Sequence, residues 1–291
     1  MTIKFFLNMQ MSLTHCIGRQ AVIHPIREQK SMSFVNDLFS LEGKVAVAIG
    51  AGGVLAGEMT LGLAKAGAKI AVLDLNPDSA EAIAVKVRDD IGGEAISLAV
   101  DATSSDDLKK ALQAILDKWG KVDILINAPG INSATPFFDI TEGEYQKIMD
   151  VNLKSMFIAC QIFGKDMVER GAGGSIINIS SASSGPPLSK VFTYSVSKAG
   201  VNNLTQYLAR EWAEDKVRVN AVAPGFFPAE QNRKILTQDR IDSIFRHTPM
   251  NRFGDPEELV GAVVWLASEK ASSFVTGALI RVDGGYTAMT I

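Results

Sequence analysis

Cysteines, histidines and long apolar runs are scarce in this sequence, and each shortage excludes a class of protein. Only two cysteines occur, Cys16 and Cys160, and they lie far apart, without CxxC or Cys/His ligand spacing. A disulfide framework or a zinc site is therefore not expected, and the chain is predicted to work in a reducing compartment, the cytoplasm. Three histidines in 291 residues also argue against histidine-based catalysis, and no metal is expected.

Neither a membrane nor a nucleic acid is predicted as a partner. The sequence contains no run of about 18 apolar residues, so no segment is expected to span a bilayer. The formal net charge of -3 provides no basic surplus for nucleic acid or anionic lipid. With 47% hydrophobic and 21% charged residues, the composition is that of an ordinary globular protein, and the expected partner is a small-molecule substrate.

Residues 1–40 differ from the rest of the chain because they show no clear hydrophobic period. They contain the further methionines Met9, Met11 and Met32. Either a flexible or partly ordered extension, or a start codon assigned too far upstream of Met32, explains the segment. The catalytic domain is expected to span residues 41–291.

From Leu41 onward, short apolar runs alternate with amphipathic segments, without a linker or an internal repeat. The predicted strands are 44–49, 69–73, 95–100, 122–127, 175–179, 217–223 and 279–282; the predicted helices are 54–66, 79–91, 103–119, 141–169, 193–214 and 257–268. Thr103 is expected to cap its helix, and Thr141 with Glu144 has the sequence of a capping box. Several strands are apolar throughout, as in parallel sheets covered on both faces. The pattern predicts a single-domain, doubly wound α/β fold of the Rossmann type with about seven strands, and ligands at their carboxyl ends.

A glycine-rich turn joins the first predicted strand to the first helix. Gly50, Gly52 and Gly53 let the backbone turn sharply and approach a pyrophosphate at the N-terminus of the helix that contains Leu55. Glycine-rich turns without a ligand are also common. The position of this one, between strand one and a helix, favours a cofactor site.

Asp74 ends the second predicted strand, 24 residues after Gly50. A carboxylate there can accept hydrogen bonds from both adenosine ribose hydroxyls, whereas it would repel a 2′-phosphate. Because no Arg or Lys lies in the glycine loop or directly after Asp74, NAD(H) is favoured over NADP(H). The alternative is that Asp74 merely starts the turn before Asn76. Asp101, followed by Ala102, either binds the adenine amino group or caps the next helix.

Tyr194 and Lys198 stand four residues apart on one face of a predicted helix. An ammonium one turn from a phenol favours the phenolate, and it is expected to lower the tyrosine pKa from its ordinary value of about 10. Most Tyr–Lys pairs are structural, but this pair follows a strand that ends at Ser181, whose hydroxyl could polarise the same substrate oxygen. Asn152, inside the preceding long helix, is either a solvated surface residue or part of a water relay.

These residues and their order resemble the short-chain dehydrogenase/reductase superfamily over essentially all of residues 41–291. The matching motifs are the Gly50–Gly57 loop, Asp74, Asp101, Asn127-Ala128-Pro129-Gly130, Asn152, Ser181, the YxxxK of Tyr194 and Lys198, and Pro224-Gly225. The resemblance implies that Tyr194 donates or accepts the proton and that Ser181 orients the carbonyl or hydroxyl group. It implies that Lys198 lowers the tyrosine pKa and holds the nicotinamide ribose, and that Asn152 anchors a relay water. The residues expected to bind NAD are Gly50, Gly52, Gly53, Leu55, Asp74, Asp101, Ala102, Asn127, Ala128, Gly130, Tyr194, Lys198, Pro224, Gly225 and Phe227.

Three positions depart from the pattern of the family. In its TGxxxGxG loop the threonine is Ile49 and the later glycines are Val54 and Ala56, so the glycines of this loop are redistributed. Its NNAG motif reads NAPG, and Pro129 removes a backbone donor near the cofactor. The threonine that often contacts the carboxamide is Ala229 here.

The substrate side carries fewer signals. Residues 226–250 follow the sixth strand and are predicted to form a lid. Gln231 and Arg233 in this lid, together with Asn132 and Lys190, fit a hydroxylated or anionic substrate; alternatively, Arg233 is simply a solvated lid residue.

This chain resembles the sugar-acid branch that contains D-mannonate oxidoreductases in its GGVL loop and in the segments PGFFPAEQNRKIL and HTPMNRFG. That branch often has a longer insertion after the fourth strand, which is absent here. The expected activity is NAD-dependent interconversion of a carbonyl and a secondary alcohol on a sugar acid or polyol, of the D-mannonate/fructuronate or gluconate type. The alternatives are a 3-oxoacyl or other carbonyl reductase and, in another class, a non-catalytic NAD-sensing or scaffold protein.

The family also implies a homotetramer in which helices 144–169 and 193–214 pair between subunits. The apolar spacing of Phe157, Cys160 and Phe163 fits packing on the sheet equally well.

Overall fold

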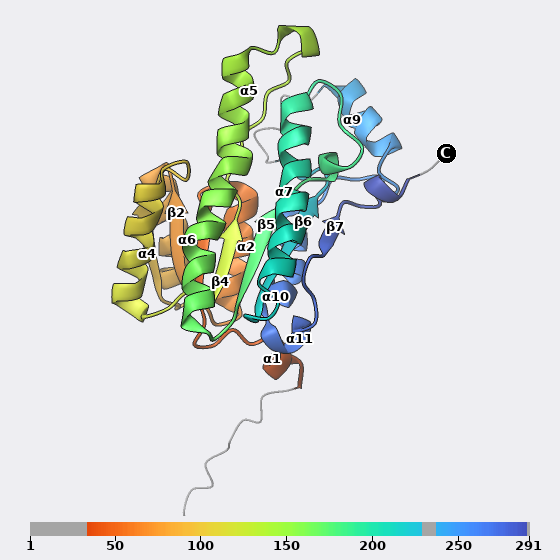
Figure 1. The fold of residues 1–291 in the computed structure, drawn as a ribbon. Coiled ribbons are helices and arrows are strands. Elements are labelled where there is room, and N and C mark those ends of the chain that lie inside the picture. The colour runs from red at the N-terminus through yellow and green to blue at the C-terminus, as the bar shows by residue number, and fades with distance from the viewer. Residues whose placement is uncertain (1–33, 229–236, 290–291) are drawn as a thin grey trace, which may run out of the picture.

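A single parallel sheet of seven strands organises the chain (Figure 1). The computed structural model describes residues 34–228 and 237–289. The strands are β1 (Val45–Ile49), β2 (Lys69–Asp74), β3 (Ala95–Ala99), β4 (Ile124–Asn127), β5 (Gly174–Ile179), β6 (Val217–Pro224) and β7 (Leu279–Val282). Their order in the sheet is β3-β2-β1-β4-β5-β6-β7, and every neighbouring pair is parallel. The predicted doubly wound α/β fold is confirmed.

Helices connect the strands. They are α1 (Phe34–Phe39), α2 (Val54–Lys65), α3 (Pro77–Val85), α4 (Ser105–Trp119), α5 (Glu142–Met149), α6 (Ser155–Arg170), α7 (Phe192–Glu211), α9 (Gln238–Arg246), α10 (Val260–Ala267) and α11 (Glu269–Ser272). Two π-helical turns are η1 (Lys86–Asp90) and η3 (Asp150–Lys154), and the 3-10 turns are η2 (Phe137–Asp139), η4 (Ala182–Ser184), η5 (Pro256–Leu259) and η6 (Tyr286–Ala288). Among the described residues, no helix has both the length and the apolar character needed to cross a bilayer.

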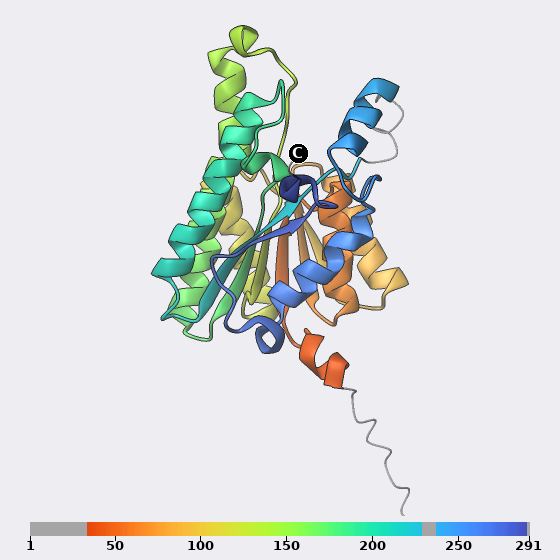
Figure 2. The same ribbon diagram turned by 90° about the vertical axis from the view of Figure 1, so that its right-hand side faces the viewer.

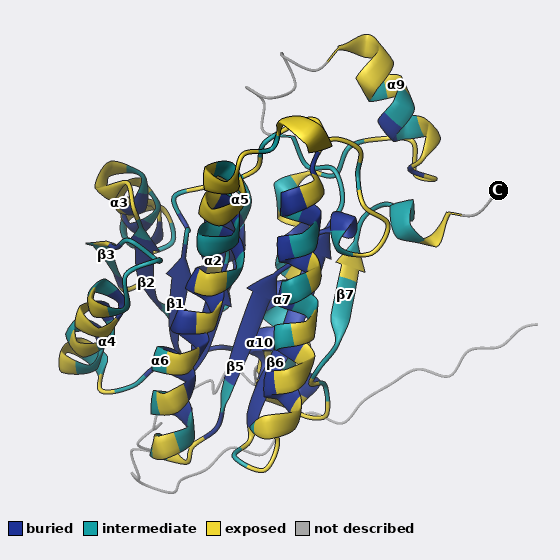
Figure 3. Ribbon diagram, turned by 45° about the horizontal axis from the view of Figure 1, so that its top comes forward, coloured by how far each residue is buried: buried dark blue, intermediate teal, exposed yellow. Residues whose placement is uncertain are grey.

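The central strand β1 shows why the sheet is apolar on both faces. Its side chains alternate in direction, so Val45 and Val47 join one core cluster and Ala46 and Ala48 join the other. The first cluster contains residues of α4, α6 and α7, and the second contains residues of α2, α3 and α10. Figure 2 shows these two helical layers edge-on. Figure 3 shows that the inner strands are buried, that the edge strand β7 is only partly so, and that the helices expose their outer faces.

The predicted long helix from Thr141 to Glu169 is interrupted. α5 passes through the π-helical turn η3 into α6, so the chain keeps its direction but changes its helical phase. Thr141 does cap α5, because its hydroxyl accepts from the backbone N–H of Glu144 at 3.1 Å. The Glu144 carboxylate, however, accepts from Thr135 at 3.0 Å, so the structure shows only half of the predicted capping box.

Helix α1 lies within the segment that the sequence assigns to an N-terminal extension. The backbone oxygen of Leu38 accepts from the Ser268 hydroxyl at 2.7 Å, and Lys270 forms an ion pair with Asp37 at 2.5 Å. This end of the segment therefore packs against α11 and its N-cap.

From β1 the chain adds β2 and β3 on one side of the sheet and then β4 to β7 on the other side. β1 and β4 are therefore neighbours, although β2 and β3 lie between them in sequence. In an open parallel sheet, the crevice outside the carboxyl ends of the strands at such a switch point is the usual place for a ligand. The loops after β1, β2, β4, β5 and β6 carry nearly all the predicted site residues to this edge.

Candidate active site

The loop between β1 and α2 can hold a pyrophosphate despite its unusual glycine spacing. Gly50 has φ +74°, and a Cβ there would lie 3.0 Å from the backbone carbon of Ala128. At Gly52, a Cβ would lie 2.6 Å from that of Ser79. Gly53 is the N-cap of α2 and provides no side chain to cap the first N–H groups of the helix. A narrow glycine cradle therefore leads into an uncapped helix N-terminus, which is the arrangement that a bound pyrophosphate needs.

Asp74 lies beside this loop. One carboxylate oxygen accepts from the backbone N–H of Gly52 at 2.9 Å, and the other accepts from that of Asn76 at 2.9 Å. Asp74 therefore does begin the turn before Asn76, as the simpler interpretation holds. It also fixes the glycine loop from the neighbouring strand, and its negative charge stands at the end of the pyrophosphate cradle.

Asp101 has a local structural role in the turn before α4. One of its carboxylate oxygens accepts from both the backbone N–H and the hydroxyl of Thr103, at 2.8 and 2.7 Å. Because Thr103 is held in this way, the helix is capped one residue later: the Ser104 hydroxyl accepts from Asp107 N–H at 3.2 Å. The prediction that Thr103 is the N-cap is wrong. Ala102 is partly buried and packs against the core.

The side chain of Asn127, at the end of β4, points into the core. It is fully buried, and its amide donates to Asn178 at 3.0 Å and to the Cys160 sulfur at 3.3 Å. A cofactor contact at this position therefore falls to the backbone. The next residue, Ala128, donates its N–H to the oxygen of Ile49 at 3.0 Å, which holds the β4 loop against the glycine loop.

Tyr194 and Lys198 lie one turn apart near the start of α7. The ammonium of Lys198 is 5.7 Å from the centre of the Tyr194 ring and donates to the backbone oxygen of Ile179 at 2.8 Å. Lys198 is 3% exposed, and this burial lowers its pKa to about 8.

The pKa of Tyr194 is raised, not lowered as the sequence predicts. Burial disfavours the charged phenolate and outweighs the hydrogen bond with Ser181, which lowers the pKa.

Ser181 follows β5 and faces Tyr194. Its hydroxyl oxygen accepts from the backbone N–H of Ser183 at 3.1 Å, which fixes the side-chain rotamer at the start of η4. The Ser181 side chain is close enough to Tyr194 to lower the pKa of its phenol, so two residues from different elements meet here. The pair could therefore hold the oxygen atom of one substrate.

Asn152 is fully buried inside the π-helical turn η3, so the interpretation as a solvated surface residue is wrong. Its carbonyl oxygen accepts from Ile131 N–H at 2.8 Å, and its amide donates to Ile131 O at 2.9 Å and to the Ser197 hydroxyl at 3.1 Å. Gly130 lies beside both Asn152 and Lys198, since a Cβ there would be 3.8 Å from the side-chain oxygen of Asn152 and 3.5 Å from the Lys198 ammonium nitrogen. Asn152 thus joins the β4 loop to α7.

Pro224 and Gly225 follow the same edge at the end of β6. A Cβ at Gly225 would lie 2.7 Å from Cα of Asp283, so only glycine fits against the neighbouring segment. Phe227 is partly buried, and its ring fills the space that a side chain at residue 254 would need.

The predicted substrate residues are less well placed. Asn132 is exposed and accepts from the backbone of Ser133 at 2.8 Å. Lys190 is exposed and has φ 65°, which is unusual for a residue other than glycine. Gln231 and Arg233 lie outside the described residues, as does Ala229.

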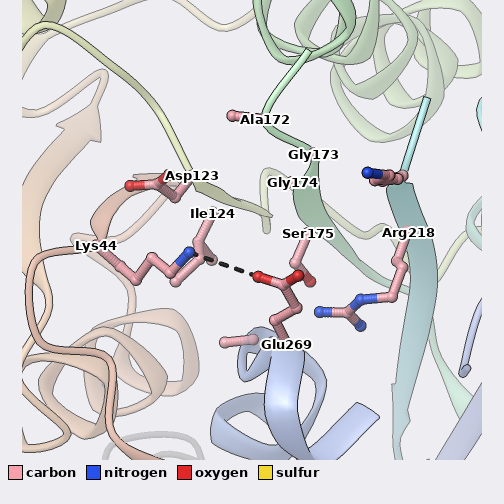
Figure 4. A pocket seen from close by; sticks show the side chains of 11 residues that line it. Lys44, Asp123, Ile124, Ala172, Gly173, Gly174, Ser175, Arg218 and Glu269 are labelled. Carbon is pink, nitrogen blue, oxygen red and sulfur yellow. Dashed lines mark ion pairs between the residues drawn. The ribbon is translucent and has the colours of Figure 1, made fainter. Parts of the chain in front are cut away.

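Two cavities lie at opposite ends of the strands. One of about 360 Å³ lies at the carboxyl end, beside Phe226, Phe227 and Met250, and has the size of a small-molecule site. The other, about 30 Å³, lies at the amino end beside Arg218 and Glu269 (Figure 4). The smaller cavity has room for about one water molecule and lies away from the switch point.

Several polar residues of the site were not predicted from the sequence. They are Ser180, Ser183, Ser184, Ser195, Ser197 and Asn202. The serine-rich segment after β5 and the four-residue spacing from Lys198 to Asn202 were the available signals. Neither reveals a partner without the fold.

Comparison with known proteins places the chain in a family. A family model described as enoyl-(acyl carrier protein) reductase matches residues 50–287. The uncharacterized oxidoreductase UxuB of Bacillus subtilis is 39% identical over 270 residues, which cover 86% of this chain and 96% of that protein. The 5-keto-D-gluconate 5-reductase of Escherichia coli is 35% identical over 252 residues, which cover 86% and 98%.

Solved structures of similar fold and sequence point to the same family. A putative D-mannonate oxidoreductase from Haemophilus influenza with bound NAD has a TM-score of 0.82 and 35% identity, covering 88% of this chain and 99% of that one. A gluconate 5-dehydrogenase from Burkholderia cenocepacia in complex with NADP and tartrate has a TM-score of 0.83 and 33% identity, covering 88% and 100%. With the parallel sheet, the glycine cradle and the Ser–Tyr–Lys arrangement, these matches show that the chain is an oxidoreductase of the short-chain dehydrogenase/reductase superfamily, in its sugar-acid branch.

Proposed function

We propose that the protein interconverts a carbonyl and a secondary alcohol on a sugar acid or polyol of the mannonate/fructuronate or gluconate type, with NAD(H) as its cofactor. The observation that carries this proposal is the meeting of Ser181, Tyr194 and Lys198 at the carboxyl edge of the sheet, next to the glycine cradle. The names of the relatives support the substrate class, because they include a 5-keto-D-gluconate 5-reductase and a gluconate 5-dehydrogenase.

In this proposal Tyr194 moves the proton at the substrate oxygen, donating it in reduction and accepting it in oxidation. Ser181 donates a hydrogen bond to the same oxygen, and the bond that its own oxygen accepts from Ser183 N–H holds the side chain in place. Lys198 supplies a buried positive charge that stabilises the phenolate form when the proton leaves. The side chain of Asn152 is occupied by Ile131 and Ser197, so a relay water would bind to its backbone oxygen.

The cofactor would lie across the switch point, between the loops after β1, β2, β4 and β6. The Gly50–Gly53 cradle would hold its pyrophosphate and Asp74 its adenosine ribose; Asp101, Ala102, Leu55, Asn127, Ala128, Gly130, Pro224, Gly225 and Phe227 complete the proposed contacts. When bound, its nicotinamide supplies or accepts the hydride. The carboxylate of Asp74 supports NAD because a 2′-phosphate would meet its negative charge. One similar structure contains NADP, so this preference needs a direct test.

We assign three further features by the same reasoning: a substrate site at the larger cavity, a homotetramer and a cytoplasmic location. Phe226, Phe227 and Met250, at the described ends of the predicted lid, line that cavity. Helices α6 and α7 pair between the subunits of a homotetramer, which the exposed side chains of Phe157 and Tyr207 support, being 45% and 58% exposed. Cys160 and Phe163, in contrast, are buried against the sheet. Light scattering tests the assembly, and fractionation of cells tests the cytoplasmic location.

The activity is tested with purified protein, NAD(H) or NADP(H), and a panel of aldonates, keto-aldonates, uronates and polyols. We expect NAD-linked turnover of a sugar acid or polyol that is lost in Tyr194→Phe. Turnover that survives this substitution would contradict the assignment of Tyr194. Binding of NADH without turnover of any panel member would favour another carbonyl substrate or a sensing role.

A further inference from the structure

A closed circuit of hydrogen bonds joins the loop that carries Ser181 to helix α7. The Ser180 hydroxyl donates to the side-chain oxygen of Asn202 at 2.5 Å. The amide of Asn202 donates to the Ser184 hydroxyl at 2.8 Å, and that hydroxyl donates to the backbone oxygen of Ser181 at 2.6 Å. The circuit thus starts one residue before Ser181 and returns to Ser181 itself.

The directions of these bonds are mutually consistent. The single proton of Ser184 is used on the backbone oxygen of Ser181, so Ser184 must accept from Asn202. The Ser180 hydroxyl lies 2.5 Å from the side-chain oxygen of Asn202 and 3.3 Å from the backbone oxygen of Lys198, so its shorter bond donates to Asn202. The Asn202 amide group provides the acceptor for Ser180 and the donor for Ser184 side by side.

A second link reinforces the same loop. The hydroxyls of Ser183 and Ser195 lie 2.6 Å apart, and Ser195 donates to the backbone oxygen of Val191 at 3.0 Å. Ser183 also donates its N–H to the hydroxyl of Ser181. The loop is therefore fastened to α7 near the start of the helix and again two turns later.

Asn202 occupies a particular place on α7. Tyr194, Lys198 and Asn202 follow one another at four-residue intervals, which places them on one face of the helix. The first two face the proposed reaction centre, and the third is partly buried against the loop of Ser181. The same helix face thus carries the proton-transfer group and the amide that holds the hydroxyl opposite it.

We infer that Asn202 is a positioning residue: through Ser180 and Ser184 it sets the distance between the Ser181 hydroxyl and the Tyr194 phenol. This inference rests on the proposed roles of Ser181 and Tyr194. Asn202 touches neither substrate nor cofactor in this account, and it acts by holding the loop. A displacement of about 1 Å at a reacting group can cost up to about 100-fold in rate. We therefore expect the loss of Asn202 to lower kcat.

The test compares Asn202→Ala with Asn203→Ala, a neighbouring asparagine that is exposed on the same helix. We expect kcat to fall by about 10- to 100-fold in Asn202→Ala. The cofactor KM and the Kd for NADH, measured by fluorescence, should stay within about twofold because the glycine cradle is not involved. Asn203→Ala should match the wild type in all three quantities.

A second variant, Ser184→Ala, cuts the same circuit from the loop side and keeps the test decisive if Asn202→Ala does not fold. Its kcat should fall similarly, and the double variant should be no slower than the slower single variant, because either change opens the circuit.

Wild-type kcat in both single variants would overturn the inference. Losses of kcat that multiply in the double variant, or that come with weaker NADH binding, would also overturn it and indicate a general structural defect. Turnover that survives in Tyr194→Phe, or wild-type protein without turnover, would instead overturn the proposed function, and this inference with it.

Discussion

The two ends of the sheet differ in how a buried charged side chain is paired. At the amino end, Asp123 accepts from Val45 N–H and forms ion pairs with Lys121 and Arg170. At the carboxyl end, Lys198 is equally buried, yet within the described residues no carboxylate pairs with it, and it donates to a backbone oxygen. Burial without a carboxylate partner disfavours the charged ammonium and lowers the pKa of Lys198 to about 8. One end is thus built for stability and the other for proton transfer.

Among substitutions that leave Tyr194 in place, removal of the Ser181 hydroxyl should lower kcat most. Ser181→Ala should lower kcat by about 100- to 1000-fold, because one donor to the substrate oxygen is lost. Steady-state kinetics checks this, with far-UV circular dichroism as the control for folding. A kcat within threefold of the wild type would remove Ser181 from the reaction.

Asp123→Ala should destabilise the protein at the amino end of the sheet. The change leaves Val45 N–H without its acceptor and removes the ion pairs with Lys121 and Arg170, so the free energy of unfolding should fall by about 2 kcal/mol. Urea titration measures it, and kcat per folded molecule should not change. Asp106→Ala is the control, because the exposed ion pair of Asp106 with Lys109 should contribute less than about 0.5 kcal/mol. Equal losses in both variants would contradict a special role for the amino end.

Asp74→Ala tests the proposed cofactor preference at the carboxyl end of the sheet. Loss of the charged acceptor should reduce kcat/KM for NAD by about 10-fold and reduce the discrimination against NADP. Measuring kcat/KM with both cofactors checks this. An unchanged NAD/NADP ratio would mean that Asp74 only holds Gly52 and Asn76.

The last expected effect is on the pH dependence of stability. Lys198 has a folded-state pKa of about 8, below its ordinary value of 10.5. Between these values the unfolded chain binds more protons, so the stability contributed at this site rises with pH across that window. The wild type should therefore gain stability relative to Lys198→Met when urea titrations at pH 7 and pH 9.5 are compared. A constant difference would show that Lys198 keeps its proton throughout.

Local patterns predicted the fold and the principal site residues. The apolar run Val45–Ile49, followed by a glycine-rich turn, is typical of a strand buried on both faces, and the four-residue spacing of Tyr194 and Lys198 places them on one helix face. In the structure, the predicted strand boundaries differ from the observed ones by no more than two residues.

What the sequence could not supply are contacts between distant segments. The partners of Asn152 are Ile131 and Ser197, and the amide of Asn127 turns to Asn178 in the core. The direction of the Tyr194 pKa shift was also wrong, because burial depends on the whole fold. Spacing along a helix shows which groups are neighbours, but not what desolvates them.

Tyr194→Phe compared with Tyr207→Phe tests the central claim most directly, since both tyrosines lie on α7 and only Tyr207 is far exposed, at 58%. The account predicts that kcat falls by about 100- to 10,000-fold in Tyr194→Phe, with NADH still bound and the fold intact, while Tyr207→Phe keeps wild-type turnover. Comparable turnover in the two variants would show that the carboxyl end of the sheet does not use Tyr194 to move the proton.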